Sequence, residues 1–320
     1  MCLKGFLYFV KKIIICGHLV AITNNIDKRI YSLQYIKSKV VNVGGKMFSE
    51  KYIKEPLNYA YSDLKKIFVG GVLELLSMAG MIFGFFLIIM GVMPYMPGFH
   101  MPMTFGTAFS GIGVLFGLVS LVLGVIFSVF VNGYYMKVIQ KTLNNEDILP
   151  EWDNFKELFV KGLLYIIGAL LLSMLFSIPY VILELVGVVY NIDSLAFILF
   201  SNLVSLIILI LSILVIPLAI INFVAKDRFL GFFQFKEIIS KISFEYVGVL
   251  VVVAVISMGA FLLWMMMIGL IVAVLYIING ILAVMGFALF LLTIPFLNVF
   301  LKIFSFRCYG KYYCSATQNK

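Results

Sequence analysis

Two carboxylates, Glu74 and Glu184, lie inside long apolar stretches of the sequence. A carboxylate is expensive to place in the hydrocarbon of a bilayer, so such residues are functional candidates by default. If both faced the interior of a helix bundle, they could couple a proton or a cation to transport. We favour the alternative, in which Glu74 reaches the inner headgroups and Glu184 lies, ionised, at the outer interface.

Other residue types that could do chemistry are sparse. The histidines are His18 and His100, and no Ser-His-Asp order or phosphate-binding loop accompanies them. Methionines around His100 offer soft ligands for Cu(I): Met90, Met93, Met96, Met101 and Met103. Methionine is also an ordinary apolar filler in this chain, and we favour that interpretation.

Acids and cysteines do not indicate a metal centre. Five acids fall within residues 145–157, and a divalent ion there is the less favoured alternative to a solvated loop. Cys2, Cys16, Cys308 and Cys314 fit neither a disulfide framework nor a zinc spacing. We therefore predict that the protein is not an enzyme and has no catalytic residue, cofactor or metal.

Composition indicates an all-α, polytopic membrane protein. The chain is 63% hydrophobic and 12% charged, with a mean hydropathy of +1.12, which is more apolar surface than a soluble domain can hide. Six stretches reach the roughly 20 apolar residues that a transmembrane helix needs. We predict these spans at residues 67–93, 104–131, 158–189, 195–224, 247–275 and 281–306.

The 24 lysines and arginines predict the orientation of the spans. All of them precede the first span, lie in or beside the second-to-third and fourth-to-fifth connections, or lie at the end of the chain from Lys302 onward. Basic residues favour the cytoplasmic side, so we predict six helices in the cell membrane with both termini inside. The net charge of +9 thus reflects membrane topology, and we expect no nucleic-acid partner.

Residues 1–46 differ from the rest of the chain, because Lys11 and Lys12 split their apolar residues into pieces too short to span a bilayer. The run Val43-Gly44-Gly45-Lys46 before Met47 could be a ribosome-binding site translated by mistake. One hypothesis is that residues 1–46 are a gene-model artefact and that Met47 is the true start. The other is a basic N-terminal arm. Residues 47–320 form a single six-span membrane domain in both cases.

The connection between the second and third spans is the most polar run between two apolar stretches. Pro150 ends any arriving helix and favours an extended Leu149. Asp153 or Asn154 can then cap a new helix that begins amphipathic. Trp152 would anchor at the inner interface, with its N–H wet. We predict a structural hub made by Leu149, Pro150, Trp152, Asp153, Phe159 and Gly162.

Two further segments are predicted to be amphipathic helices on the cytoplasmic side. One is the basic run 51–66. The other lies between the fourth and fifth spans, where apolar residues share one side of a helical wheel: Phe232, Phe235, Ile238, Ile239 and Ile242. Within the first two spans, Gly80/Gly84 and Gly113/Gly117 have the small-xxx-small spacing of close helix packing.

These motifs together resemble one family, the largely archaeal membrane family catalogued as Domain of Unknown Function four thousand and thirteen. The resemblance covers roughly residues 50–315. It rests on Tyr59-Ala-Tyr-Ser-Asp63, Gly133-Tyr134, Leu149-Pro-Glu-Trp-Asp153 with Gly162, and the loop from Arg228 to Ile239. The resemblance implies a multi-pass membrane fold and, since the family has no established activity, no site residues.

Two functions remain open. The first is a non-catalytic membrane protein that organises lipid, a membrane-protein partner or a second copy of itself at the inner leaflet. The alternative is a small permease that uses Glu74 and Glu184. We favour the first because it requires no site that the sequence lacks.

Overall fold

The computed structural model describes residues 47–93, 103–192 and 194–318. The hypotheses on residues 1–46 and on most of the methionine- and histidine-bearing loop therefore lie outside the described residues. The chain divides into two units, Met1–Lys51 and Tyr52–Lys320. Of the first unit only the helical residues 47–51 are described, and the following paragraphs concern the second.

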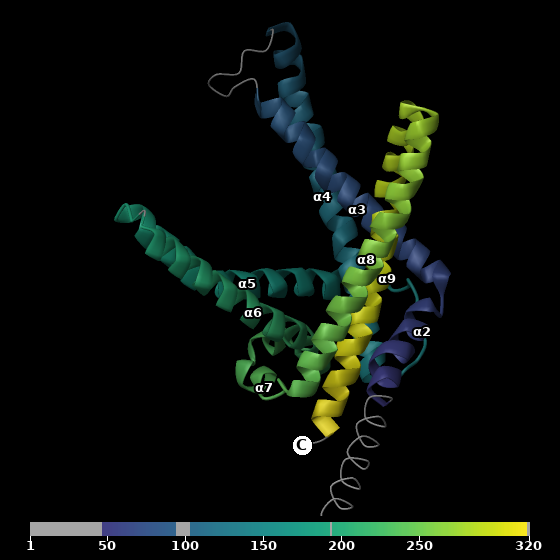
Figure 1. The fold of residues 1–320 in the computed structure, drawn as a ribbon, viewed down its shortest axis with the longest axis vertical. Helices are drawn as coiled ribbons and strands as arrows, with labels where there is room; N and C mark the ends of the chain where they lie inside the picture. The colour runs from purple at the N-terminus through teal and green to yellow at the C-terminus, as the bar shows by residue number, and fades with distance from the viewer. Residues whose placement is uncertain (1–46, 94–102, 193, 319–320) are drawn as a thin grey trace, which may run out of the picture. The chain divides into compact units, whose positions relative to one another are not determined.

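The described residues form helices and no strand, which confirms the all-α prediction. Six long helices are apolar enough to cross a membrane. They are α3 (Leu64–Val92), α4 (Met103–Leu143), α5 (Phe155–Val189), α6 (Leu195–Lys226), α8 (Phe244–Ile278) and α9 (Gly280–Gln318). Shorter helical segments are η1 (Glu50–Lys54), α2 (Glu55–Tyr61), η3 (Phe229–Phe233) and α7 (Phe235–Ile239). The long helices pair along the chain as α3–α4, α5–α6 and α8–α9 (Figure 1).

Two helices extend well beyond their predicted spans. We predicted that the second span ends at residue 131 and the sixth at 306, but α4 continues to Leu143 and α9 to Gln318. Both extensions are packed inside protein: Tyr135 and Ile139 in α4, and Cys308 and Tyr312 in α9, are at most 2% exposed. Because helix–helix contacts replace lipid there, these turns need not be uniformly apolar.

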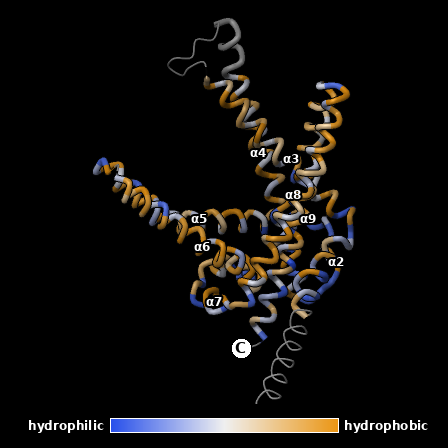
Figure 2. The backbone as a smooth tube through the Cα atoms, viewed as in Figure 1, coloured by the Kyte–Doolittle hydropathy of each residue, from blue (hydrophilic) through white to orange (hydrophobic). Residues whose placement is uncertain are grey.

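Buried side chains gather at one end of the long helices. They concentrate in residues 129–139, 215–223, 246–253 and 299–313, which adjoin the predicted inner connections. The opposite halves of the helices expose large apolar side chains, for example Leu199, Leu263 and Ile277. Figure 2 shows the same division, with hydrophilic residues around α2 and α7 and long hydrophobic stretches in α5, α6 and α8. Lipid is the solvent that suits these exposed halves.

Glycines permit close contact between neighbouring helices. A Cβ atom added to Gly80 of α3 would lie 2.8 Å from the backbone of Gly124 in α4, and one on Gly84 would lie 2.8 Å from the Gly117 carbonyl. The predicted small-residue packing of Gly80, Gly84 and Gly117 is therefore confirmed. Helices α4 and α5 approach still more closely, since a Cβ on Gly162 would lie 1.9 Å from the Val129 carbonyl oxygen.

The second polar loop is not the single amphipathic helix that we predicted. It forms η3 and α7, separated by Gln234. The buried Asn222 amide of α6 donates to the Gly231 carbonyl at 2.8 Å and to Gln234 Oε1 at 3.1 Å, which holds the chain in this broken form. Phe232 is fully buried, whereas Ile239 of the same predicted apolar face is 56% exposed.

The predicted topology can be tested by cysteine accessibility at two exposed positions, Ser194 and Asn144. We expect Ser194→Cys to react with a membrane-impermeant thiol reagent in intact cells, and Asn144→Cys to react only after permeabilisation. Asn144 is preferable to its neighbour Asn145, whose φ of 57° disfavours cysteine. If Asn144→Cys but not Ser194→Cys is labelled in intact cells, the orientation is the reverse of the predicted one.

Candidate functional site

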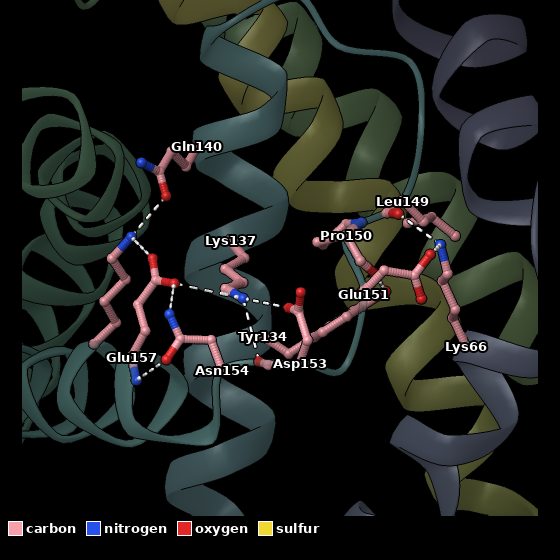
Figure 3. Close-up of polar contacts among 11 residues, drawn as sticks. Lys66, Tyr134, Lys137, Gln140, Leu149, Pro150, Glu151, Asp153, Asn154 and Glu157 are labelled. Carbon is pink, nitrogen blue, oxygen red and sulfur yellow. Dashed lines mark hydrogen bonds and ion pairs between the residues drawn. The ribbon is translucent and has the colours of Figure 1, made fainter.

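The hub loop, residues 144–154, connects α4 to α5. Lys66 of α3 binds the middle of this loop. Lys66 Nζ donates to the Leu149 carbonyl at 2.8 Å and forms an ion pair with Glu151 at 2.7 Å (Figure 3). Leu149 is 1% exposed and Pro150 is also buried. A backbone carbonyl in such a place needs a donor, and the lysine supplies it from a helix 83 residues earlier.

Trp152 packs within the protein. Its ring stacks on Tyr134 with centroids 3.9 Å apart, and its Nε1 donates to the Lys66 carbonyl at 2.9 Å. The Tyr134 hydroxyl in turn donates to the Pro150 carbonyl at 3.1 Å. The prediction that the indole N–H is wet was therefore wrong, because a helix carbonyl accepts its hydrogen bond.

Ion pairs join α4 to the hub loop and to the start of α5. Lys137 of α4 pairs with Asp153 of the hub loop at 2.9 Å and with Glu157 of α5 at 3.5 Å (Figure 3). Lys161 pairs with Glu157 within α5 at 2.6 Å. The Lys137 ammonium, through a hydrogen bond and its charge, holds the pKa of the exposed Asp153 carboxyl below its usual value. Asn154, one of the two predicted caps, caps α5 by accepting from the Glu157 backbone N–H at 3.4 Å.

Phe159 and Gly162 place α5 against α4. The Phe159 ring lies 5.7 Å from the ring of Phe130 in α4, and Gly162 forms the close backbone contact with Val129 described above. The predicted hub residues therefore all lie where α4, the hub loop and α5 meet.

A polar cavity of about 360 Å³ lies beside the hub loop. Its lining residues are Lys137, Gln140, Lys141, Asn144, Glu146, Pro150, Glu151, Asp153 and Glu157. The lysines and acids of this lining are largely engaged with one another or with Lys66 and Lys161. Among the described residues, no group of three or more His, Cys, Asp or Glu side chains is placed to hold a metal ion. The cavity is thus an electrically balanced part of the hub.

Arg307 is the central residue that sequence reasoning missed. It is fully buried in α9, and its Nη2 pairs with Glu55 of α2 at 2.7 Å and with Asp147 of the hub loop. Its Nη1 donates to the Glu146 carbonyl at 2.7 Å, and its guanidinium lies 4.1 Å from the Tyr59 ring centroid. One side chain thereby joins three segments that are far apart in sequence. A lone arginine after the sixth apolar stretch had suggested only a terminal cytoplasmic cation.

A second buried polar group centres on Asn222 of α6, which the sequence analysis also did not single out. The Tyr313 hydroxyl donates to Asn222 Oδ1 at 2.7 Å. Lys241 is 5% exposed, and its Nζ lies 4.0 Å from the Tyr313 ring centroid. Tyr313 therefore connects α9 to both α6 and the segment before α8.

The two intramembrane carboxylates are not brought together. Glu74 of α3 is half-buried and accepts a hydrogen bond from Asn298 Nδ2 of α9 at 2.8 Å. Glu184 is half-buried near the end of α5, in a hollow shared with residues of α6. The two acids share no partner among the described residues.

Comparison with known proteins identifies the family. Residues 116–273 match a family described as "Protein of unknown function (DUF4013)". An uncharacterized protein of Methanocaldococcus jannaschii is 35% identical over 213 residues, which is 65% of this chain and 74% of the relative. The chain belongs to the DUF4013 family. A second uncharacterized protein of that organism is 28% identical, over 82% of this chain and 96% of its own length. No solved structure matches.

The DUF4013 match covers the hub but not all of the residues that contact the hub loop. Gly133, the hub loop, Gly162 and Asn222 lie within residues 116–273, whereas Lys66 and Arg307 lie outside. The relatives are uncharacterized, so the roles of these residues follow from their contacts alone.

The Trp152 contacts predict a measurable cost for a mild substitution. Trp152→Phe keeps an aromatic ring on Tyr134 but loses the hydrogen bond to Lys66, so we expect about 1 kcal/mol less stability in detergent. Trp264→Phe is the matched control, because Trp264 stacks on Phe290 and should lose less. Equal destabilisation of the two variants by chemical denaturation would contradict this role.

Arg307 should be much less tolerant. Removing one partner from a buried ion pair leaves uncompensated charge, so Arg307→Met should cost about 3–5 kcal/mol. Arg228→Met, at an exposed arginine, should change the unfolding midpoint little. An Arg307→Met protein as stable as the Arg228→Met protein would show that the buried guanidinium is dispensable.

Proposed function

We propose that this protein is a non-catalytic component of the cell membrane that organises anionic lipid, and partners held with it, at the inner leaflet. The observation that carries the proposal is a set of exposed cations beside exposed large apolar side chains. They occur at the end of the long helices where buried side chains gather, which is the end at the predicted inner interface.

Four such cations lie on four different segments. Lys65 lies beside Leu64 and Phe68, and Lys156 beside Phe155, with each of these apolar side chains 60–63% exposed. Arg228 lies near Leu230, which is 71% exposed, and Lys236 near Ile239. None of the four forms an ion pair with another described residue, in contrast to the lysines of the hub.

This pairing suits the boundary between headgroups and acyl chains. An apolar side chain can enter the acyl region while the neighbouring cation extends to a phosphate. Each lysine or arginine near an anionic leaflet contributes about 1 kcal/mol of attraction. The hub charges, by comparison, neutralise one another and are not available to a ligand.

Lipid composition tests the proposal. Protein extracted with its surrounding lipid in polymer-bounded discs should contain several-fold more anionic lipid, relative to neutral lipid, than the bulk membrane. Replacing Lys65, Lys156, Arg228 and Lys236 together by Gln should remove this enrichment. Exchanging lysine for arginine and arginine for lysine at the same positions should preserve it, because the charge is kept.

Bulk lipid composition around the wild-type protein would contradict the proposal. So would proton flux into wild-type proteoliposomes that Glu74→Gln abolishes, and this result would favour a carrier. A glutamine at residue 74 still offers Asn298 a carbonyl acceptor, so the variant changes charge with little change in packing.

A further inference from the structure

We propose that the hollow at the turn between α5 and α6 is a binding site for a small organic ammonium ion. The hollow has a volume of about 510 Å³, within the range of small-molecule sites. Its described lining consists of Tyr180, Glu184, Gly187, Val188, Asn191, Ile192, Phe197, Ile198, Ser201 and Asn202.

The charge of the lining is suited to a cation. Among the described lining residues, Glu184 is the one carboxylate, and there is no lysine or arginine. The sequence carries no lysine or arginine anywhere between residues 162 and 225. Tyr180 lies one helical turn before Glu184, and both residues line the hollow. A half-buried carboxylate without a cation attracts one from solution more strongly than a fully solvated carboxylate does.

The remaining lining favours an organic ammonium over a metal ion. A calcium site takes six to eight oxygen ligands and usually several carboxylates, whereas the described lining of this hollow has one. Tyr180 and Phe197 supply aromatic faces that attract ammonium groups, and Val188 and Ile192 can contact an alkyl chain. Asn202 uses its Nδ2 to donate to the Ile198 carbonyl at 2.9 Å, which leaves its side-chain oxygen as an acceptor for an ammonium N–H.

Local backbone structure fixes the shape of the hollow. Asn191 ends α5 in the left-handed conformation with φ 50°, and the Ile192 N–H donates to the Gly187 carbonyl at 2.9 Å. A Cβ on Gly187 would lie 2.5 Å from the Phe197 ring, so glycine lets this ring lie against α5 as one wall. The turn and its wall are thus specified by Gly187 and Asn191 before any ligand binds.

The site is independent of the lipid role proposed above, and it would face the outside of the cell under the predicted topology. Binding can be measured in a nonionic detergent, where neither the orientation nor the lipid composition enters.

The test is titration of the purified protein with n-butylammonium chloride, followed by isothermal calorimetry or ligand-observed NMR. We expect saturable binding to the wild-type protein and about tenfold or more weaker binding to Glu184→Gln, the loss that one ion pair of about 1.4 kcal/mol would give. Asp227→Asn, an exposed acid at the other end of α6, should bind like the wild type. Tyr180→Leu, which keeps the charge but loses an aromatic face, should bind several-fold more weakly.

Two results would overturn the proposal. One is wild-type affinity in both Glu184→Gln and Tyr180→Leu, with circular dichroism showing both variants folded. The other is an unexpected outcome of a displacement experiment. If excess n-butylammonium fails to displace the bound n-butylammonium, the binding is simple ion screening. If Ca²⁺ displaces it equally well, the hollow is a metal site.

Discussion

The buried Arg307 guanidinium is the constraint on which the packed end of the molecule depends. Removing a guanidinium from water costs several kcal/mol, which is offset only if charged and carbonyl acceptors surround it. Glu55, Asp147 and the Glu146 carbonyl provide these acceptors from α2 and the hub loop. The position of α9 therefore depends on the positions of α2 and the hub loop. Displacement of any one of the three leaves buried charge unpaired.

Glycine contacts allow α4 and α5 to pack closely at the end of the fold that carries the hub loop. Gly133 and Gly162 bring the backbones of α4 and α5 together, and the hub loop closes over Lys66 and Trp152 beside them. Away from this end, each helix already satisfies its own backbone hydrogen bonds, so apolar side chains can face lipid without further protein contact. The specific polar contacts of the fold thus lie at one end, and the apolar surface that suits the bilayer lies at the other.

The distribution of paired and unpaired charge connects this architecture to function. Lys66, Lys137 and Lys161 are used within the hub, whereas exposed cations such as Lys156 remain available at the surface. Glu184 is the corresponding unneutralised acid at the other end of α5. This distribution supports the proposed lipid role of the exposed cations and the proposed ammonium site at Glu184.

Local sequence determined the membrane class, the six helices and a cap at Asp153 or Asn154, because apolar length and capping depend on neighbouring residues; the structure decided for Asn154. Only the tertiary structure decided how far α4 and α9 extend, since their last turns are stabilised by partners more than 150 residues away, such as Glu55 on Arg307. The break at Gln234 likewise depends on Asn222 in another helix. A sequence pattern indicates which side chains can leave water. The partner of a buried polar group depends on the tertiary structure, because that partner is distant in sequence.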